Sequence, residues 1–235
     1  SLIFDGTTLA QHDVLVVTIN YRLGPLGFLA HPWLSEEAAS DSAVGTSGNY
    51  GLMDKIAALQ WVKRNIEVLG GDPQNVTIFG QSAGSQSVCS LMTAPSAQGL
   101  FHKAIGQSAA CVNQLTQADA NGHERGQALV DALGASSIED LRGAEPDALL
   151  VAMTKSNWES ESRIVVDGRV LPRWPHEVFA AGEQSDIPLM LGFLADEGYE
   201  LFEVESALTE AELTAFLGYV GGNREAELNT PYDAS

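Results

Sequence analysis

Cysteine and basic residues are scarce in this chain of 235 residues, and each shortage excludes a class of protein. Only two cysteines occur, Cys89 and Cys111, which excludes a disulfide scaffold, and neither their spacing nor neighbouring histidines suggest a metal site. We interpret Cys89 as a small buried apolar residue. Lysine and arginine number 12 against 31 acidic residues, so binding to nucleic acid or to an anionic membrane surface is not expected.

Long apolar runs and a signal-like start are also lacking. No apolar stretch has the length that a membrane span requires. The chain opens at Ser1 without a methionine or a secretion signal, so the sequence leaves a cytoplasmic and a secreted location open. The content of 45% hydrophobic and 18% charged residues is ordinary for a soluble α/β protein.

The apolar residues that are present alternate between strand and helix patterns. Residues 14–20 form a nearly continuous β-branched run, which predicts a strand covered on both faces within a parallel sheet. Apolar residues then recur at helical spacing through 51–69. Shorter strands are predicted at 76–79, 104–107 and 187–191. This alternation indicates an α/β fold with a parallel sheet.

The character of the sequence changes between residues 121 and 155, where three short helices are predicted. They cover 125–133, 137–142 and 146–153. We expect them to form an insertion outside the sheet. Residues 203–229 are amphipathic and are also predicted to be helical. Since no repeat, low-complexity tract or linker interrupts the chain, we predict one domain over residues 1–235.

Residues 79–84 read Phe-Gly-Gln-Ser-Ala-Gly and match the G-x-S-x-G turn between a strand and a helix. In that turn a strained corner exposes a serine as a nucleophile. We expect glycine to be required at Gly80 and Gly84, because a side chain at either place would collide with the neighbouring strand or helix. Ser82 is therefore the candidate nucleophile. A buried serine in an ordinary strand-to-helix turn is the alternative.

Motifs along most of the chain stand in the order seen in one family. They occupy residues 20–24, 26–28, 48–54, 58–62, 70–73, 76–80, 165–168, 171–172, 191–192 and 196–198. Together they resemble the type-B carboxylesterases, the group that also contains the cholinesterases. The resemblance implies an α/β-hydrolase fold with a central, mostly parallel sheet and flanking helices. It also implies hydrolysis of a small-molecule carboxylic ester through an acyl-enzyme, with no metal or organic cofactor.

The resemblance assigns roles to individual residues. It makes Ser82 the nucleophile, Glu197 the acid that orients a catalytic histidine, and the backbone N–H of Ala83 one donor to the oxyanion. A carboxylate at the carboxyl end of a strand can reach the imidazole Nδ1 proton, which fixes the tautomer that accepts the serine proton. Asp196 is the neighbouring alternative, and the family pattern alone favours Glu197.

Further residues are expected around this site. The resemblance places Ser108 near the triad, although a simple serine at a strand end is an equal alternative. Gln81 stands where many relatives have glutamate, so a negative charge beside the site is absent, which should alter rate or substrate preference. Trp158 and the residues around Cys111 could line the acyl pocket, and a core or surface role suits them as well.

The histidine that such a triad requires is missing. In this fold the histidine follows the acid, but none occurs after residue 197. The histidines present are His12, His31, His102, His123 and His176. None has a matching context, and we interpret each as a surface or partly buried structural residue. The glycine-rich oxyanion segment should precede residue 14, where only Gly6 is found.

We therefore interpret the chain as an internal fragment, incomplete at both ends and inactive by itself. The competing hypothesis is an esterase-like interaction module without catalysis. Such relatives typically lose the elbow serine, whereas Ser82 is retained here. An amidase or a lactonase with the same machinery stays open, because leaving-group preference depends on the shape of the pocket.

Overall fold

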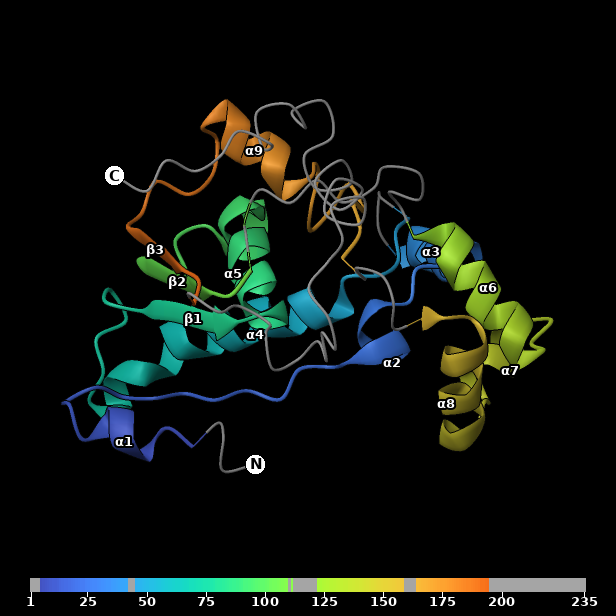
Figure 1. The fold of residues 1–235 in the computed structure, drawn as a ribbon, viewed down its shortest axis with the longest axis horizontal. Coiled ribbons are helices and arrows are strands. Elements are labelled where there is room, and N and C mark those ends of the chain that lie inside the picture. The colour runs from blue at the N-terminus through green and yellow to red at the C-terminus, as the bar shows by residue number, and fades with distance from the viewer. Residues whose placement is uncertain (1–4, 42–44, 110, 112–121, 159–163, 195–235) are drawn as a thin grey trace, which may run out of the picture. The chain divides into compact units, whose positions relative to one another are not determined.

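The computed structural model describes residues 5–41, 45–109, 111, 122–158 and 164–194 (Figure 1). The chain divides into two units, Ser1–Phe193 and Leu194–Ser235, and the described residues belong to the first apart from Leu194. The helix expected at 203–229 thus lies outside the described residues. One domain over residues 1–235 stays a prediction.

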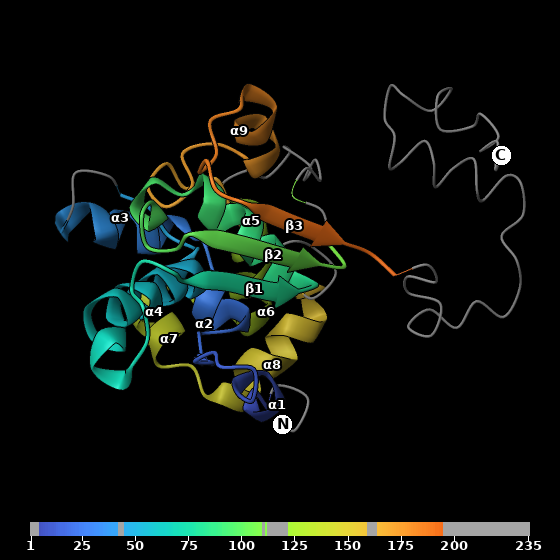
Figure 2. The same ribbon diagram turned by 90° about the vertical axis from the view of Figure 1, so that its left-hand side faces the viewer.

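The first unit contains a parallel sheet (Figure 2). In the described residues its order is β1 (Thr77–Gln81), β2 (Lys103–Gln107) and β3 (Leu189–Gly192). Gln81 lies beside Gln107, and Gln107 lies beside Gly192, so the strands end at one common edge. The parallel α/β arrangement and these three strands confirm the prediction.

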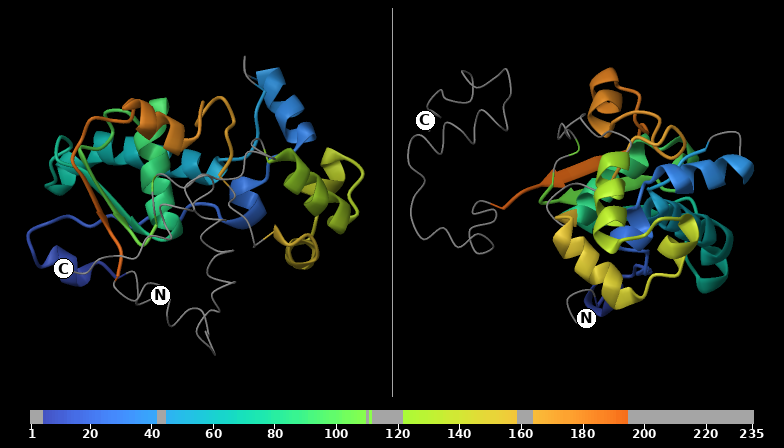
Figure 3. Two further views of the ribbon diagram at one scale, coloured as in Figure 1. Left: turned by 45° about the horizontal axis from the view of Figure 1, so that its top comes forward. Right: turned by 90° about the vertical axis from the view of Figure 1, so that its right-hand side faces the viewer.

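Helices cover one face of this sheet through a shared apolar core. α4 (Tyr50–Asn65) continues into the 3-10 turn η2 (Ile66–Leu69), and α5 (Ala83–Thr93) follows β1. Apolar side chains of α4 and α5 and the strand residue Ala104 belong to one buried cluster. α5 packs on β1 and β2 and also contacts α9 (Pro175–Ala181), as Figure 3 shows. The η2 turn ends at Gly70, whose φ of 89° suits glycine.

The three helices expected as an insertion are present. They are α6 (His123–Leu133), α7 (Ile138–Arg142) and α8 (Pro146–Lys155). α6 and α8 pack together in a second core that also contains Leu29 and Trp158. Trp158 is 6% exposed there, which favours the core role over pocket lining. α6 lies against the backbone near Leu29, because a Cβ on Gly126 would come 1.8 Å from the carbonyl oxygen of Ala30.

Short helices precede α4 and follow α5. They are α1 (Thr7–Ala10), α2 (Gly24–Phe28), α3 (Pro32–Asp41) and the 3-10 turn η3 (Pro95–Ala97). Among the residues described, no helix has the length and apolar character needed to cross a membrane.

The prediction of a buried strand over residues 14–20 is wrong for the described structure. This segment is no strand, and Val14, Leu15, Val17 and Ile19 are between 41% and 52% exposed. A β-branched run becomes a buried strand only when neighbouring strands pair with its backbone. None of the described strands pairs with it.

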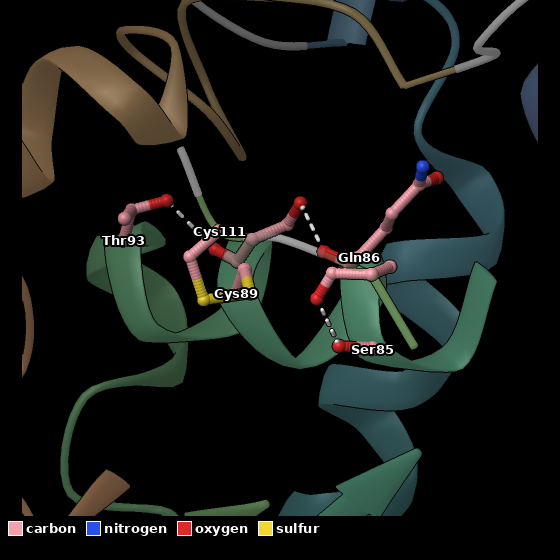
Figure 4. Close-up of a disulfide and its surroundings, with 7 residues drawn as sticks. Ser85, Gln86, Cys89, Thr93 and Cys111 are labelled. Atoms are coloured by element: carbon pink, nitrogen blue, oxygen red, sulfur yellow. Dashed lines mark hydrogen bonds between the residues drawn. A yellow bond between two sulfur atoms is a disulfide. The ribbon is translucent and has the colours of Figure 1, made fainter. Parts of the chain in front are cut away.

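The interpretation of Cys89 as a simple buried residue also needs correction. Cys89 is indeed only 2% exposed, but it forms a disulfide with Cys111 (Figure 4). The two residues are 22 positions apart in the chain, and their Cα atoms are 5.0 Å apart. They meet because α5 packs against β2, and Cys111 follows β2.

Candidate active site

Ser82 stands at the corner between β1 and α5. β1 ends at Gln81, α5 begins at Ala83, and Ser82 has a φ of 54° and a ψ of −118°. A positive φ in a non-glycine residue is uncommon and is held only by its surroundings. The N–H of Ser82 donates to the carbonyl oxygen of Gln107 at 2.8 Å, which ties the corner to the next strand. The predicted sequence of strand, strained turn and helix is therefore confirmed.

The two glycines of the motif differ in what surrounds them. A Cβ on Gly80 would lie 2.4 Å from the carbonyl carbon of Gly84 and 2.5 Å from its oxygen, so the predicted collision at Gly80 is confirmed. A Cβ on Gly84 would meet no described atom within 4 Å. The collision predicted there is wrong for the described part of the chain, because the backbone of Gly84 approaches Gly80 while its own side-chain position is open.

The start of α5 offers backbone donors beside Ser82. The first N–H groups of an α-helix have no partner within the helix, and the helix dipole places partial positive charge at this end. Ala83 is the first residue of α5, and no acidic residue lies in the first turn. Ser82 and Ala83 are both exposed. Negative charge that develops on an atom next to Ser82 would be stabilised here.

Ser108 occupies the corresponding place after β2. Because Gln81 and Gln107 are register partners, Ser82 and Ser108 leave adjacent strands at the same edge of the sheet. Ser108 also has a positive φ, of 55°, and its N–H donates to the carbonyl oxygen of Gly192 at 2.8 Å. The structure thus brings Ser108 to the edge that carries Ser82. Gln81 is exposed on β1 beside Gln107.

The predicted acid, Glu197, and its alternative, Asp196, lie outside the described residues. The strand that leads to them can still be placed. β3 ends at Gly192, five residues before Glu197 in the sequence, and it ends at the edge where β1 ends.

The histidines of the chain are all described, and none is hydrogen-bonded to the candidate nucleophile. The backbone N–H of Trp33 donates to Nδ1 of the buried His31 at 3.2 Å, and His31 Nε2 lies 3.0 Å from Gln127 Oε1. Nδ1 of His102 accepts from the N–H of Val76 at 3.2 Å. These two imidazoles therefore have structural partners. Within the described ranges no cluster of acidic, cysteine and histidine side chains could hold a metal ion.

The sequence did not single out Ser85, which lies one turn into α5. Its side chain is completely buried, and its Oγ donates to the carbonyl oxygen of Ala109 at 2.9 Å. A Cβ on Gly106 of β2 would come 2.5 Å from this Oγ, so the hydroxyl fills the space that the glycine leaves. The contact between Ser85 and Gly106 could not be recognised from the sequence, because it depends on the packing of α5 against β2.

Comparison with known proteins identifies the family. The model of the carboxylesterase family matches residues 1–216. The para-nitrobenzyl esterase of Bacillus subtilis (strain 168) is 41% identical over 236 residues, which cover 96% of this chain and 46% of that protein. The fumonisin B1 esterase of Sphingopyxis macrogoltabida is 40% identical over 224 residues, covering 91% of this chain and 39% of that protein.

Solved structures agree with the sequence comparison. A PNB esterase structure is 36% identical and has a TM-score of 0.80, covering 99% of this chain and 50% of that one. The fold is thus the α/β-hydrolase fold of these esterases. The chain spans half or less of the length of these relatives. On the match over residues 1–216 and on these identities, the chain belongs to the carboxylesterase family.

Proposed function

We propose that this protein is a serine-dependent carboxylic-ester hydrolase that acts on small-molecule esters. The observation that carries the proposal is Ser82, held at a strained corner between β1 and α5 with the first amides of α5 beside it. The family relatives named above are esterases for para-nitrobenzyl and fumonisin B1 compounds, which supports ester chemistry and leaves the substrate of this chain to be measured.

Ser82 Oγ would attack the ester carbonyl carbon as a base removes its proton. The tetrahedral oxyanion would accept a hydrogen bond from the Ala83 N–H, at the positive end of α5. As the tetrahedral intermediate collapses, the base would give the proton it took from Ser82 to the leaving oxygen, so that the alcohol departs and an acyl group stays on Ser82. A water that the same base activates would then hydrolyse the acyl group. The base would be a histidine outside this chain, oriented by Glu197, with Asp196 as the alternative acid.

Two nearby residues would shape this site without reacting. Gln81 is neutral, so it leaves the positive potential at the start of α5 uncompensated, which favours the oxyanion. Ser108 leaves the sheet beside Ser82 and would hold the surroundings of the triad through its bond to Gly192.

The first test compares hydrolysis of p-nitrophenyl butyrate by the 235-residue chain and by its Ser82→Ala variant. We expect no difference, because the chain has no histidine beside Ser82. In a full-length protein that supplies the histidine, Ser82→Ala should lower kcat by several orders of magnitude, on the order of a million-fold in a comparable triad. Ser90→Ala is the matched control, since Ser90 lies on the same helix and its Oγ bonds to Gln86 within that helix.

Two results would contradict parts of the proposal. Turnover by the 235-residue chain that depends on Ser82 would mean that another base serves, and would contradict the assignment of the base to a histidine outside this chain. A full-length protein that folds but shows no Ser82-dependent hydrolysis would favour the non-catalytic interaction module instead.

We also propose the extent and location of the domain. Residues 1–235 would form part of a single α/β-hydrolase domain, with α6, α7 and α8 as a helical insertion. The Cys89–Cys111 disulfide favours the secreted of the two locations that the sequence left open, because disulfides persist in oxidising compartments. Recovery of the native protein with both thiols free would contradict this location.

A further inference from the structure

Two hydrogen bonds connect the start of α5 to the residues that leave β2. The N–H of Ser82 donates to the carbonyl oxygen of Gln107 at 2.8 Å. The Oγ of Ser85 donates to the carbonyl oxygen of Ala109 at 2.9 Å. Both bonds join the candidate nucleophile or the helix that follows it to the backbone of the adjacent strand or its continuation.

The disulfide continues the same series. Figure 4 shows Ser85 and Cys89 on α5, with Cys111 beside Cys89. Positions 82, 85 and 89 follow one another at helical spacing and so share one face of α5. Their partners 107, 109 and 111 are alternate residues of the segment that leaves β2. We call residues 107, 108, 109 and 111 the strap.

The lengths of the two elements allow this pairing. From residue 82 to residue 89 a helix rises about 10 Å. The chain turns at Ser108, whose φ is 55°, so the strap is shorter than the span of about 13 Å that a fully extended chain would have from residue 107 to residue 111. The strap meets the start of α5 at three successive points, through Ser82, Ser85 and Cys89.

The contacts of the strap are buried. Ser85 is 0% exposed, and Cys89 and Cys111 are 2% and 5% exposed. A buried hydroxyl that loses its acceptor is costly, so the bond from Ser85 to Ala109 is strongly maintained. The space for this hydroxyl exists because residue 106 is glycine, where a Cβ would lie 2.5 Å from Ser85 Oγ.

The strap matters for Ser82 because the backbone of Ser82 is strained. A residue with a positive φ persists only where its surroundings over-determine it. For Ser82 one of the determining bonds runs to Gln107, the first residue of the strap. Movement of the strap away from α5 would weaken this bond and let the corner relax.

We propose that Ser85 and the Cys89–Cys111 disulfide are positioning residues, which hold the strap along α5 and thereby fix the strained conformation of Ser82. Their effect on ester hydrolysis rests on the proposed function. Their effect on the backbone of Ser82 does not, so the two can be tested separately.

The test measures hydrogen–deuterium exchange of single amides in the 235-residue chain by NMR. Ser85→Ala should speed exchange of the Ser82 amide about tenfold, the loss expected for one buried hydrogen bond. A Cys89→Ala/Cys111→Ala variant should speed it in the same direction. Ser90→Ala is the control, because Ser90 is also buried on α5 but bonds within the helix, and it should change the Ser82 amide less than twofold.

Reduction gives a second route if either variant fails to fold. Excess dithiothreitol converts the disulfide to two thiols while its own dithiol becomes a cyclic disulfide, and the Ser82 amide should again exchange faster. Equal exchange at Ser82 in Ser85→Ala and Ser90→Ala, or no change on complete reduction, would overturn the proposal.

Kinetics separate positioning from general stability. In a full-length protein that hydrolyses esters, Ser85→Ala should lower kcat about tenfold and leave KM nearly unchanged, since a misplaced nucleophile affects the transition state more than binding. A rise in KM with kcat unchanged would overturn the positioning role. A full-length protein without any esterase activity would refute the proposed function. The positioning role of the strap would then be decided by hydrogen–deuterium exchange at Ser82 alone.

Discussion

Lys55 is an amine buried among aromatic rings on α4. It is 6% exposed, and its Nζ lies 3.3 Å from the ring centroid of Tyr21 and 5.6 Å from that of Phe28. In the described residues this Nζ has no hydrogen-bond partner. Loss of water lowers the pKa of Lys55 from 10.5 to about 8, and the charge of Asp54 acts in the opposite direction. The ammonium form is therefore disfavoured by folding.

We expect Lys55→Met to stabilise the chain at pH 7 by about 1 to 3 kcal/mol. The lower pKa corresponds to a cost of about 3 kcal/mol for keeping Lys55 charged in the folded state. Attraction between the ammonium and the face of the Tyr21 ring offsets up to about 2 kcal/mol of this cost. The folded pKa lies below the unfolded one, so the unfolded chain binds more protons between about pH 8 and 10.5, and the wild type gains stability as pH rises through this window. Urea unfolding should show that the variant exceeds the wild type in free energy of unfolding by less at pH 10.5 than at pH 7.

The exposed Lys63 on the same helix provides the control. At pH 7, Lys63→Met should change the free energy of unfolding by less than about 1 kcal/mol, because the exposed Nζ of Lys63 makes one hydrogen bond, to the carbonyl oxygen of Gly99 at 3.0 Å. If Lys55→Met and wild type differed by a constant amount at both pH values, the lowered pKa of Lys55 would be wrong.

At the scale of elements, the helices and strands around Ser82 could be predicted because their signals are local. Each signal is contained in a short stretch of sequence, since α4 has 16 residues, β1 has 5, and the motif that opens α5 ends at Gly84. The prediction of a strand over residues 14–20 was wrong because a strand needs neighbouring strands to pair with its backbone, and a β-branched run does not supply them by itself. The role of Ser85 and the pairing of Cys89 with Cys111 were missed for the same reason, since the partners of Ser85 and Cys89 follow a different strand.

The disulfide is expected to stabilise the connection between α5 and the end of β2 by about 3 kcal/mol, the loop-closure value for cysteines at this separation. Replacing both with alanine should lower the free energy of unfolding by that amount, as measured by guanidinium titration under oxidising conditions. Dithiothreitol should destabilise the wild type and leave the double variant unchanged. An equal effect of the reductant on both proteins would show that the disulfide carries no stability.

At the scale of the whole molecule, the two faces of the sheet differ. Ala104 is buried in the main core on the face that meets α5. On the other face Phe79, Ile105 and Met190 lie side by side in register, and Phe79 and Met190 are 55% and 66% exposed. Parallel sheets are normally covered on both faces, so this apolar row is unusual.

We expect the 235-residue chain to bind the dye ANS at this row, and Phe79→Ser to lower its fluorescence at least twofold, because ANS reports accessible apolar surface. Val68→Ser is the control, since Val68 is 85% exposed in η2, outside the sheet. The relatives are about twice as long as this chain, so a full-length protein has further residues with which to cover the row, and it should bind less ANS per molecule. Equal ANS binding by Phe79→Ser and wild type would mean that the row is already covered in the 235-residue chain.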